Sequence, residues 1–573
     1  MVLPKKSLVD AVGYEPPLSI PDYIMKLDFN ENILGPSPKV AEALRKVSKE
    51  DIKLYPAYGE LIKRIAEYNN ADKKMILPTN GADEAIKYVF DAFVDKEDTV
   101  LSVTPTFTMP QVYAKVSGCN FKEIPYSQKW VFPLDDFIAA VDEKTKMIII
   151  TTPNSPTGDV ISRDDLLKII NAAPESIILI DQTYCGYGGE NFIDLVYKYP
   201  NVIIVRSMSK DFALAGIRLG YLISEIQNIN IIKKVISPFS VNNFAVKAGI
   251  AALDDLDFFK GVKAKVKESK KILTEGLSGI AKEIYESHGN FIFADFGERA
   301  EFIYKKLLKN GIKVKFFDDG SVIQNCFRIT LPAPEQAEYI LDVLKSRELL
   351  IFDMDGVLVD TANSYRMAIR KTYEYFSGDK IGHDEIQQAK NQGGLNNDWD
   401  LTAHLLKTQR IEIDMVDLIT KFQEYYFGNN GDGYIRNEEF LLDKDLLSEL
   451  AKEYDLAIFT GRPKEEAKVA LTRAGVFDLF YPVITMEDVP RGKHKPNSHG
   501  IKHILDVIQP TKAYYFGDTV DDMICAKGAG VMPVGILPPQ DKSDYLRGRL
   551  EEYGAENVLD DIKDLEEFLK RAQ

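Results

Sequence analysis

The sequence is poor in the residues that build disulfide frameworks and metal clusters. Its 573 residues include four cysteines and six histidines. The cysteines (Cys119, Cys185, Cys326 and Cys525) lie far apart without a CxxC pair, so neither a disulfide framework nor a zinc site is predicted. Such sparse, unpaired cysteines are typical of a reducing compartment, and we expect a cytoplasmic protein.

Long apolar runs and an excess of positive charge are lacking too. No run approaches the roughly 20 residues of a membrane helix, and the first residues have no signal-peptide core. Asp and Glu number 87 against 71 Lys and Arg, which gives a net charge of −16. This charge argues against nucleic acid or an anionic membrane as the main partner, but it is compatible with small phosphorylated substrates.

The hydrophobic pattern is that of an α/β protein with more than one domain. Short β-branched runs such as MIIITT and ESIILID alternate with amphipathic stretches such as RDDLLKIINAA, as in parallel sheets covered by helices. A helix ending in LDVLKS runs almost directly into the strand ELLIFDMDG. We therefore place a boundary near Ser346–Glu348, with domains over 1–346 and 347–573 and no flexible linker.

Polar motifs follow several of the predicted strands in the first domain. Lys210 comes after the strand NVIIVRS, where desolvation would suit a lysine for Schiff-base chemistry. Asp181 ends the strand IILID, and Asn154 follows the strand MIIITT. The segment TNGADEA is a glycine turn that opens a helix, whose backbone N–H groups can hold a phosphate.

In this order, the segments resemble fold-type I pyridoxal-phosphate (PLP) aminotransferases of class I/II, most closely the histidinol-phosphate aminotransferases. LDFNENILGPSP, TPTF, PNSPTG, DQTY, SMSKDFALAGIRLGY, GNF and FRIT carry the resemblance over about residues 10–345. It implies a large and a small α/β domain, and a transamination that uses glutamate and 2-oxoglutarate.

The resemblance also assigns roles around the cofactor. Lys210 would form the Schiff base and move a proton, and Asp181 would pair with the pyridinium nitrogen so that the ring acts as an electron sink. Asn154 and Tyr184 would bind the phenolic oxygen, and Phe107 would stack on the ring. The residues implied around the cofactor phosphate are Ala82, Asp83, Ser207, Ser209 and Arg218, with Tyr55 supplied by the partner subunit of a homodimer.

The substrate end is where the sequence departs from this family. The resemblance assigns the substrate anion to Arg328, with Tyr14 nearby. Lys315, in VKFF, stands where the family has a second arginine, and lysine keeps the charge without the bidentate fork. Transamination is therefore better supported than histidinol phosphate as its substrate.

In the second domain, a strand ends in two aspartates. Asp353 and Asp355, in LLIFDMDG, point to one face of a strand, where oxygen ligands suit Mg²⁺ and one carboxylate can attack phosphorus. Three further motifs follow: AIFTGR with Thr460, GKHKP with Lys495 (or Lys493), and YYFGDTVDD with Asp518 and Asp522. Together they resemble the haloacid-dehalogenase (HAD) superfamily over about 349–570, with a helical cap inserted at 361–450.

That resemblance implies a Rossmann-like core and a phosphatase reaction. Asp353 would be the nucleophile, while Asp355 would protonate the leaving oxygen and later activate water. Thr460 and Lys495 would hold the phosphoryl oxygens. Mg²⁺ would be bound by Asp353, the backbone carbonyl of Asp355, Asp518 and, in support, Asp522. In the cap, Asn396, Asn397, Asp398 and Trp399 are equally compatible with substrate contacts and with a helix cap beside a packed tryptophan.

Two activities on one chain suggest consecutive steps on one phosphorylated compound. Imidazole-acetol phosphate and histidinol phosphate fit the first resemblance, and the histidine pathway follows from it. Phosphoserine or serinol phosphate fits the same logic. Two further alternatives are a PLP decarboxylase of a phosphorylated amino acid, and a chain in which one domain is a non-catalytic regulatory partner.

Overall fold

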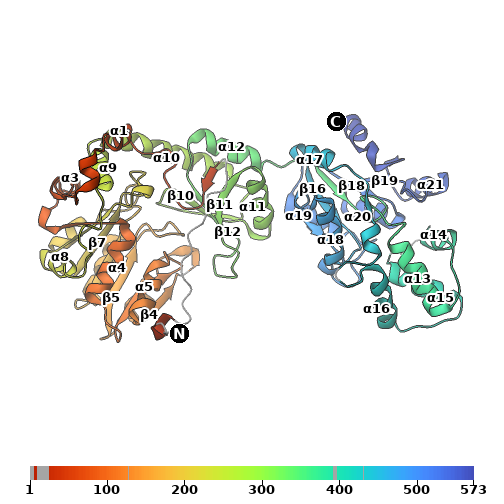
Figure 1. Cartoon of the computed structure of the whole chain (residues 1–573), viewed down its shortest axis with the longest axis horizontal. Coiled ribbons are helices and arrows are strands. Elements are labelled where there is room, and N and C mark those ends of the chain that lie inside the picture. Colours follow the sequence, from red (N-terminus) through yellow and green to blue (C-terminus); the bar gives the residue numbers. More distant parts are fainter. Residues whose placement is uncertain (1–4, 9–24, 127, 392–396, 430, 573) are drawn as a thin grey trace. The chain divides into compact units, whose positions relative to one another are not determined.

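The chain divides into two compact units, Met1–Leu344 and Lys345–Gln573. The computed structural model describes residues 5–8, 25–126, 128–391, 397–429 and 431–572. Each unit has its own sheets and helices, which can be followed along the chain in Figure 1. Each also has its own buried apolar clusters. None of the helices in the described ranges has the length and apolarity that crossing a membrane requires.

A seven-stranded sheet forms the centre of the first unit. Its order is β2-β8-β7-β6-β5-β3-β4, and β8 alone runs antiparallel to both of its neighbours. Ile- and Val-rich strands such as β5, β6 and β7 are buried on both faces, as parallel strands between helices must be. The strands are β2 (Ile76–Thr79), β3 (Thr99–Thr104), β4 (Asn120–Pro125), β5 (Thr145–Thr151), β6 (Ile177–Asp181), β7 (Val202–Ser207) and β8 (Gly220–Ser224).

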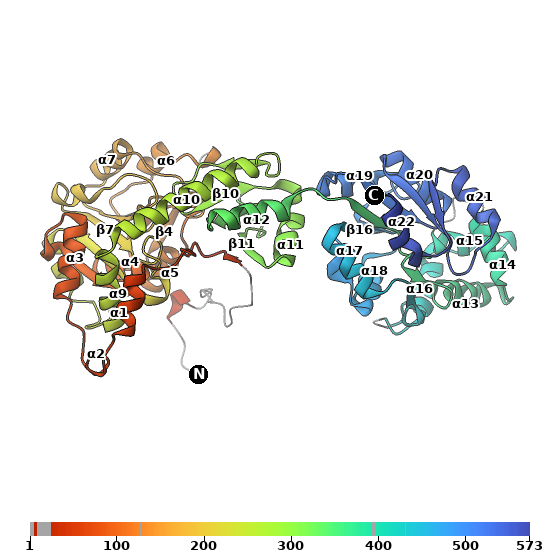
Figure 2. The same ribbon diagram turned by 90° about the horizontal axis from the view of Figure 1, so that it is seen from above.

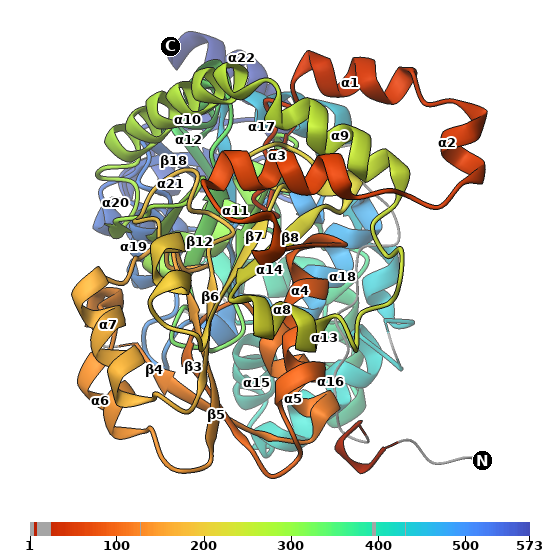
Figure 3. The same ribbon diagram turned by 90° about the vertical axis from the view of Figure 1, so that its left-hand side faces the viewer.

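Helices cover both faces of this sheet. One apolar cluster joins the sheet to α3 (Gly59–Asn69), α7 (Arg163–Ala172) and α9 (Asn243–Leu253). A second cluster joins the other face to α4 (Gly81–Phe93), α5 (Met109–Ser117) and α8 (Ile226–Ile232), and Figure 3 shows α4 and α8 well apart from α3 and α9. The remaining helices before α10 are α1 (Pro38–Arg45), α2 (Lys49–Lys53) and α6 (Leu134–Ala139).

A smaller sheet, in the order β1-β11-β12-β10-β9, completes the first unit. The long helix α10 (Leu256–Gly276) packs beside α12 (Pro334–Leu344), as Figure 2 shows. Helix α11 (Ala300–Lys309) contacts β11 and α12. The strands are β1 (Met25–Leu27), β9 (Glu283–Tyr285), β10 (Phe291–Asp295), β11 (Ile312–Phe316) and β12 (Cys326–Thr330).

The second unit is built on a six-stranded sheet in which every pair of neighbours is parallel. One face packs on α17 (Lys444–Glu453), α18 (Lys464–Ala474) and α22 (Leu565–Ala572). Helices α19 (His499–Ile508) and α20 (Val520–Ala529) contact β16, β18 and β19, and α21 (Asp544–Glu552) follows. In sheet order the strands are β17 (Val483–Ile484), β16 (Asp455–Phe459), β13 (Leu349–Phe352), β18 (Ala513–Gly517), β19 (Met532–Ile536) and β20 (Asn557–Leu559).

A helical cap is inserted between β13 and β16. Its helices share an apolar cluster of their own. They are α13 (Tyr365–Ser377), α14 (His383–Asn391), α15 (Asp398–Thr408) and α16 (Met415–Tyr426). The chain enters the cap through β14 (Val359–Asp360) and leaves it through β15 (Glu439–Phe440), and these two short strands pair antiparallel.

Candidate active sites

In the first unit, the predicted cofactor residues follow neighbouring parallel strands. Asn154 comes three residues after β5, Asp181 is the last residue of β6, and Lys210 comes three residues after β7. Thr151 at the end of β5 is paired with Asp181, and Asp181 is paired with Val205 of β7. Because carboxyl ends of parallel strands share one edge, the three residues meet at that edge of the sheet.

Beside this edge, the backbone at the start of α4 and the guanidinium of Arg218 form a cradle. The Arg218 Nη2 atom donates to Asp83 Oδ2 over 2.9 Å. Gly81 has φ +84°, and a Cβ there would lie 2.7 Å from Arg218 Nη2, so glycine lets the guanidinium approach the helix N-terminus. A Cβ on Gly220 would likewise meet the Ala82 nitrogen at 2.8 Å.

Two predicted serines flank this cradle. Ser207 is the register partner of Gly220, and its hydroxyl accepts a bond from the Ser209 N–H over 3.1 Å. Both serines are buried. Free helix N–H groups, hydroxyls and a guanidinium together form an anion site.

Asp181 and Asn154 are held from the neighbouring loops. Asp181 Oδ1 accepts bonds from the N–H and the hydroxyl of Thr183, over 2.9 and 2.7 Å. Burial raises the pKa of Asp181 to about 6, because the two Thr183 bonds offset desolvation only in part. Asn154 accepts from the Thr106 hydroxyl over 2.6 Å and donates to the Thr157 hydroxyl over 2.8 Å.

The remaining predicted residues of this site face it from several elements. Lys210 Nζ donates to the Phe29 carbonyl over 2.7 Å, and the Tyr184 hydroxyl accepts from Asn30 over 3.0 Å. Asn30 was not predicted, although it lies in the quoted segment LDFNENILGPSP. Phe107 follows β3 and packs on the apolar cluster around α4. Arg328 donates to the Ser155 hydroxyl over 2.9 Å and to the Asp28 carbonyl over 2.5 Å.

Three predicted residues lie apart from this group or outside the described ranges. Tyr55 is 79% exposed and stacks on Phe239 with ring centroids 4.5 Å apart. Lys315 is the cross-strand partner of Arg328 but is exposed, with its ammonium 5.4 Å from the Phe317 ring centroid. Tyr14 lies outside the described residues.

The residues present fit pyridoxal phosphate. A buried carboxylate with a raised pKa suits a protonated ring nitrogen, which would supply the missing positive charge. The glycine-lined cradle at α4 suits the phosphate, and Lys210 follows the strand next to Asp181. The strand register places Asp181 and the strand that precedes Lys210 at one edge of the sheet, so one molecule can contact both.

In the second unit, neighbouring strands again end together. Asp353 follows β13, Thr460 follows β16 and Asp518 follows β18; β13 lies between the other two strands and is parallel to both. Lys495 Nζ lies 2.7 Å from Asp353 Oδ1 and 2.7 Å from Asp522 Oδ1. The lysine side chain is 5% exposed, so this double ion pair is buried. The alternative, Lys493, is exposed.

Three of these carboxylates fit a divalent cation. Asp353, Asp518 and Asp522 each offer an oxygen, and the three oxygens lie within 4.8 Å of one another. Burial raises the pKa of Asp353 to about 7, although Lys495 opposes this, and it raises the pKa of Asp518 well above its usual range. A hard cation such as Mg²⁺ would stabilise the charged carboxylates. Gly356, with φ +77°, allows the close approach of Asp518, because a Cβ would clash with its carboxylate.

Asp355 does not belong to this group of three, because its side chain is bound by an arginine that had no predicted role. The Nε and Nη2 atoms of Arg462 donate to Asp355 Oδ1 over 2.8 and 2.5 Å. The other edge of the guanidinium binds Glu438, with Nη1 2.9 Å from Oε2. Arg462 and Glu438 are both 0% exposed. Arg462 lies in the quoted motif AIFTGR, whereas nothing near Glu438 in the sequence indicates a role.

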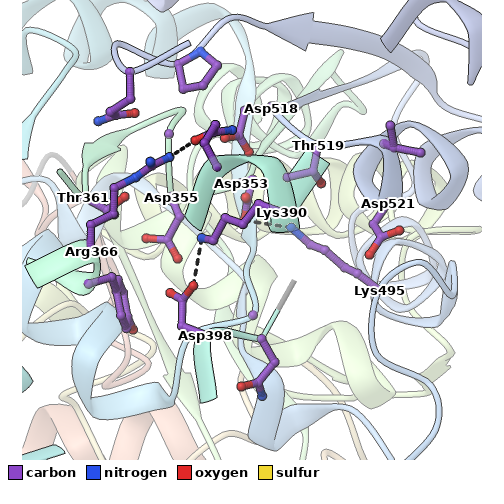
Figure 4. Close-up of a pocket in the computed structure, with 18 of the residues that line it drawn as sticks. Asp353, Asp355, Thr361, Arg366, Lys390, Asp398, Lys495, Asp518, Thr519 and Asp521 are labelled. Atoms are coloured by element: carbon purple, nitrogen blue, oxygen red, sulfur yellow. Dashed lines mark hydrogen bonds and ion pairs between the residues drawn. The ribbon is translucent and has the colours of Figure 1, made fainter. Parts of the chain in front are cut away.

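A pocket opens over these aspartates, and the cap supplies its wall. Figure 4 shows Lys390, Arg366 and Asp398 of the cap facing Asp353, Asp355 and Asp518 of the core. Lys390 Nζ lies 2.8 Å from Asp398 Oδ1.

Both sequence interpretations of the cap motif have support in the described residues. Asn397 caps α15 by accepting from the Trp399 and Asp400 N–H groups, over 2.9 and 3.4 Å. Trp399 packs against the apolar cluster of the cap. Asn397, Asp398 and Trp399 nevertheless also line the pocket. Asn396 lies outside the described residues.

Comparison with known proteins gives the class of the first unit. Residues 22–344 match the family model "Aminotransferase class I and II", and the chain belongs to that family. Among curated relatives, a histidinol-phosphate aminotransferase of Clostridium beijerinckii is 30% identical, covering 56% of this chain and 90% of its own. Histidinol-phosphate aminotransferase 1 of Carboxydothermus hydrogenoformans is 32% identical, covering 59% of this chain and 97% of its own.

A solved structure supports the same fold, and a second family accounts for the rest of the chain. The histidinol-phosphate aminotransferase of Clostridium acetobutylicum is 25% identical with a TM-score of 0.51, covering 56% of this chain and 98% of that one. Residues 350–536 match the model "Haloacid dehalogenase-like hydrolase". The chain is therefore an enzyme that joins an aminotransferase part to a HAD-type hydrolase part, and both predicted families are confirmed.

Asp181→Asn should flatten the pH dependence of stability of the cofactor-free protein. Between the ordinary pKa of 3.8 and about 6, the folded chain keeps a proton that the unfolded chain releases, so the free energy of unfolding falls as pH rises. The substitution should remove this fall in the free energy of unfolding, which is on the order of 3 kcal/mol. Denaturant unfolding across this range measures it, with the exposed Asp164→Asn as control; equal slopes in wild type and Asp181→Asn would contradict the burial argument.

Arg462→Met should destabilise the second unit by roughly 3–5 kcal/mol, because it leaves two carboxylates without their buried cation. Adding Glu438→Gln should restore part of the lost stability, because the buried negative charge of Glu438 is then removed. Lys464→Met is the control, because Lys464 pairs with Asp488 over 3.9 Å at the surface and should contribute less than about 1 kcal/mol. Denaturant unfolding tests all three, and a double variant less stable than Arg462→Met would refute the account.

Proposed function

We propose that the chain is a bifunctional enzyme that transaminates a phosphorylated keto compound and hydrolyses a phosphate monoester. The observation that carries this proposal is that each unit brings a full set of reacting groups to one sheet edge. In the first unit these are Lys210, Asp181 and the cradle at α4. In the second they are the aspartates around Lys495.

For the first reaction, glutamate and 2-oxoglutarate would be the amino-group partners. When bound, pyridoxal phosphate supplies an electron sink for the electrons of a broken Cα–H bond. Asp181 would hold a proton on the ring nitrogen, and Asn154 and Tyr184 would orient the ring oxygen. Lys210 would take the proton from the substrate Cα and deliver it to C4′ of the cofactor. Arg328, in the middle of β12 at the centre of the small sheet, would bind an anionic group of the substrate.

For the second reaction, Asp353 is the attacking group. Its carboxylate oxygen would form a bond to phosphorus while the bond to the alcohol oxygen breaks, and Asp355 would give that oxygen a proton. Water would then attack the phosphorus of the acyl phosphate, lose its proton to Asp355 and release inorganic phosphate from Asp353. Thr460 and Lys495 would bind the phosphoryl oxygens. Mg²⁺, held by Asp353, Asp518 and Asp522, would offset charge on the phosphoryl group.

Consecutive action on one compound is the simplest reason for joining these reactions. Because the relatives are named for histidinol phosphate, histidinol phosphate and imidazole-acetol phosphate are the first candidates. A phosphorylated amino acid such as phosphoserine is the second candidate. It is favoured by Arg366 of the cap, which forms no ion pair with the described residues, and by the exposure of Lys315.

We further propose that the first unit is a homodimer. Tyr55 is 79% exposed beside Leu54 at 58% and Ile52 at 67%, and it stacks on the half-exposed Phe239. Four large apolar side chains on one surface are costly in water, and a partner subunit would bury them. Tyr55 would then reach the cofactor phosphate of that partner.

A panel of amino donors tests the substrate of the first reaction. Glutamate, histidinol phosphate, phosphoserine, serinol phosphate and threonine phosphate are added to PLP-loaded protein, with EDTA to stop hydrolysis. A true donor converts the cofactor to its amino form, and the absorbance of the cofactor records this. Conversion by histidinol phosphate would support the first candidate, and conversion by phosphoserine alone would replace it with the second. Release of CO₂ without need of 2-oxoglutarate would indicate a decarboxylase instead.

Lys210→Ala and Asp353→Asn should separate the two activities. Lys210→Ala should abolish transamination and spare Mg²⁺-dependent phosphate release, because the two residues belong to different units. Asp353→Asn should do the reverse, with at least a roughly 1,000-fold loss of hydrolysis, since no other carboxylate replaces the nucleophile. Both activities are assayed on each full-length variant. A wild-type chain that lacks one of the activities would show that the corresponding unit is a non-catalytic partner.

A further inference from the structure

A buried arginine of the cap faces the hydrolase pocket. Arg366 lies in the first turn of α13, is 6% exposed and lines the same pocket as Asp353, Asp355 and Asp518. Figure 4 shows its side chain on the cap side of the pocket, across from the core aspartates. Its guanidinium donates to the amide oxygen of Gln387, another cap residue of the pocket.

The other cations of the pocket and its floor already have carboxylate partners. Lys495 binds Asp353 and Asp522, and Arg462, beneath the pocket, binds Asp355 and Glu438. Lys390 pairs with Asp398 over 2.8 Å, and Arg549 pairs with Glu552 over 2.9 Å. An anion that binds one of these cations has to share it with a carboxylate that is already bound.

Arg366 differs from all of them. Within the described residues, no carboxylate oxygen lies within ion-pair distance of its guanidinium. Its buried Nε atom has no hydrogen-bond partner, which is true of Arg549 as well, but Arg549 has an ion-pair partner. Four carboxylates, led by Asp398 and Asp518, act on Arg366 from beyond ion-pair distance. A buried charge without a direct counterion still costs free energy. Such a group persists where a bound ligand supplies the counterion, and the open side of Arg366 is the pocket.

We propose that Arg366 binds a carboxylate on the alcohol part of the phosphate ester, so that the hydrolase acts on phosphorylated amino or hydroxy acids. The proposal rests on the phosphatase function proposed above and names its substrate class. The transferred phosphoryl group has its own cation, Lys495, beside the nucleophile. Arg366 is therefore assigned to a second anionic group. The Nε hydrogen of Arg366 has no acceptor and can donate to a carboxylate oxygen, and a planar guanidinium suits carboxylate recognition.

This assignment separates the candidate substrates by charge. Phosphoserine carries a carboxylate next to its ammonium group. Histidinol phosphate and serinol phosphate carry an ammonium group and no carboxylate, so their alcohol parts would bring a positive charge toward Arg366 without a counterion. If both halves of the chain act on one compound, that compound is then a phosphorylated amino acid.

A matched pair of esters isolates the carboxylate. Phosphoserine and phosphoethanolamine share the ammonium group and the primary phosphate ester, and differ by the carboxylate. With Mg²⁺ and the full-length enzyme, kcat/KM should favour phosphoserine by roughly 30-fold or more, the usual effect of one buried charge pair. Arg366→Gln should reduce this ratio to near one, mainly through the KM of phosphoserine, and should leave hydrolysis of p-nitrophenyl phosphate within about threefold.

Two further variants keep the result interpretable. Arg366→Lys should recover part of the preference, because it restores the charge without the fork. Arg370 lies one turn along α13, outside the pocket, and its Nε donates to the Ile381 carbonyl. Arg370→Gln should therefore leave the ratio unchanged. Retained p-nitrophenyl phosphate hydrolysis shows that each variant is folded.

The outcomes separate this inference from the function on which it rests. Hydrolysis of p-nitrophenyl phosphate without a preference for phosphoserine would overturn the carboxylate site and leave the phosphatase in place. Equal loss on all esters in Arg366→Gln would assign Arg366 to the transferred phosphoryl group and overturn the proposal as well. If the wild-type enzyme with Mg²⁺ hydrolyses none of the esters, the proposed phosphatase itself is wrong, and the substrate class falls with it.

Discussion

Parallel neighbouring strands end at one edge of their sheet, and the chemistry of both units depends on this constraint. In the first unit, β5, β6 and β7 bring Asn154, Asp181 and Lys210 together from three separate segments. In the second, β16, β13 and β18 do the same for Thr460, Asp353 and Asp518. Strands buried on both faces have little freedom to shift register, because a slip of one residue turns every side chain to the opposite face.

Buried charge is the second constraint, and the two units meet it differently. Asp181 is buried and accepts bonds from the neutral donors of Thr183, and desolvation raises its pKa. A cofactor with a protonated ring would offset that desolvation. In the second unit the aspartates are balanced by Lys495 and Arg462, which are themselves almost fully buried. Removing one member of such a network leaves its partner uncompensated, so the network tolerates little change.

The cap connection adds a structural role to this network. Glu438 lies directly before β15, where the chain leaves the cap, and it binds Arg462 of the core together with Tyr426 and Ser364. Arg462 in turn binds Asp355. One buried guanidinium therefore links the cap connection to the residue proposed as the acid and base of hydrolysis. The position of Asp355 is coupled to the cap through a chain of direct contacts.

Local sequence predicted the fold class and both families, and the comparisons confirm these. The reason is that each motif combines a buried strand with the polar residue directly after it, as in LLIFDMDG and IILIDQTY. That combination can be recognised in the local sequence without knowledge of distant contacts. The roles of Lys210, Asp353 and the other motif residues stay predictions, although the structure brings most of them together.

Contacts between distant parts of the chain were decided by the tertiary structure alone. Arg462 meets Asp355 across 107 positions and Glu438 across 24, and Arg366 becomes a pocket residue only when the cap folds over the core edge. Lys315 and Arg328 are cross-strand partners, yet Lys315 is exposed. The sequence by itself determined which chemistry follows each strand. Which cations are paired, and which one is left for a ligand, depends on the packing of helices against that edge, and no local pattern records it.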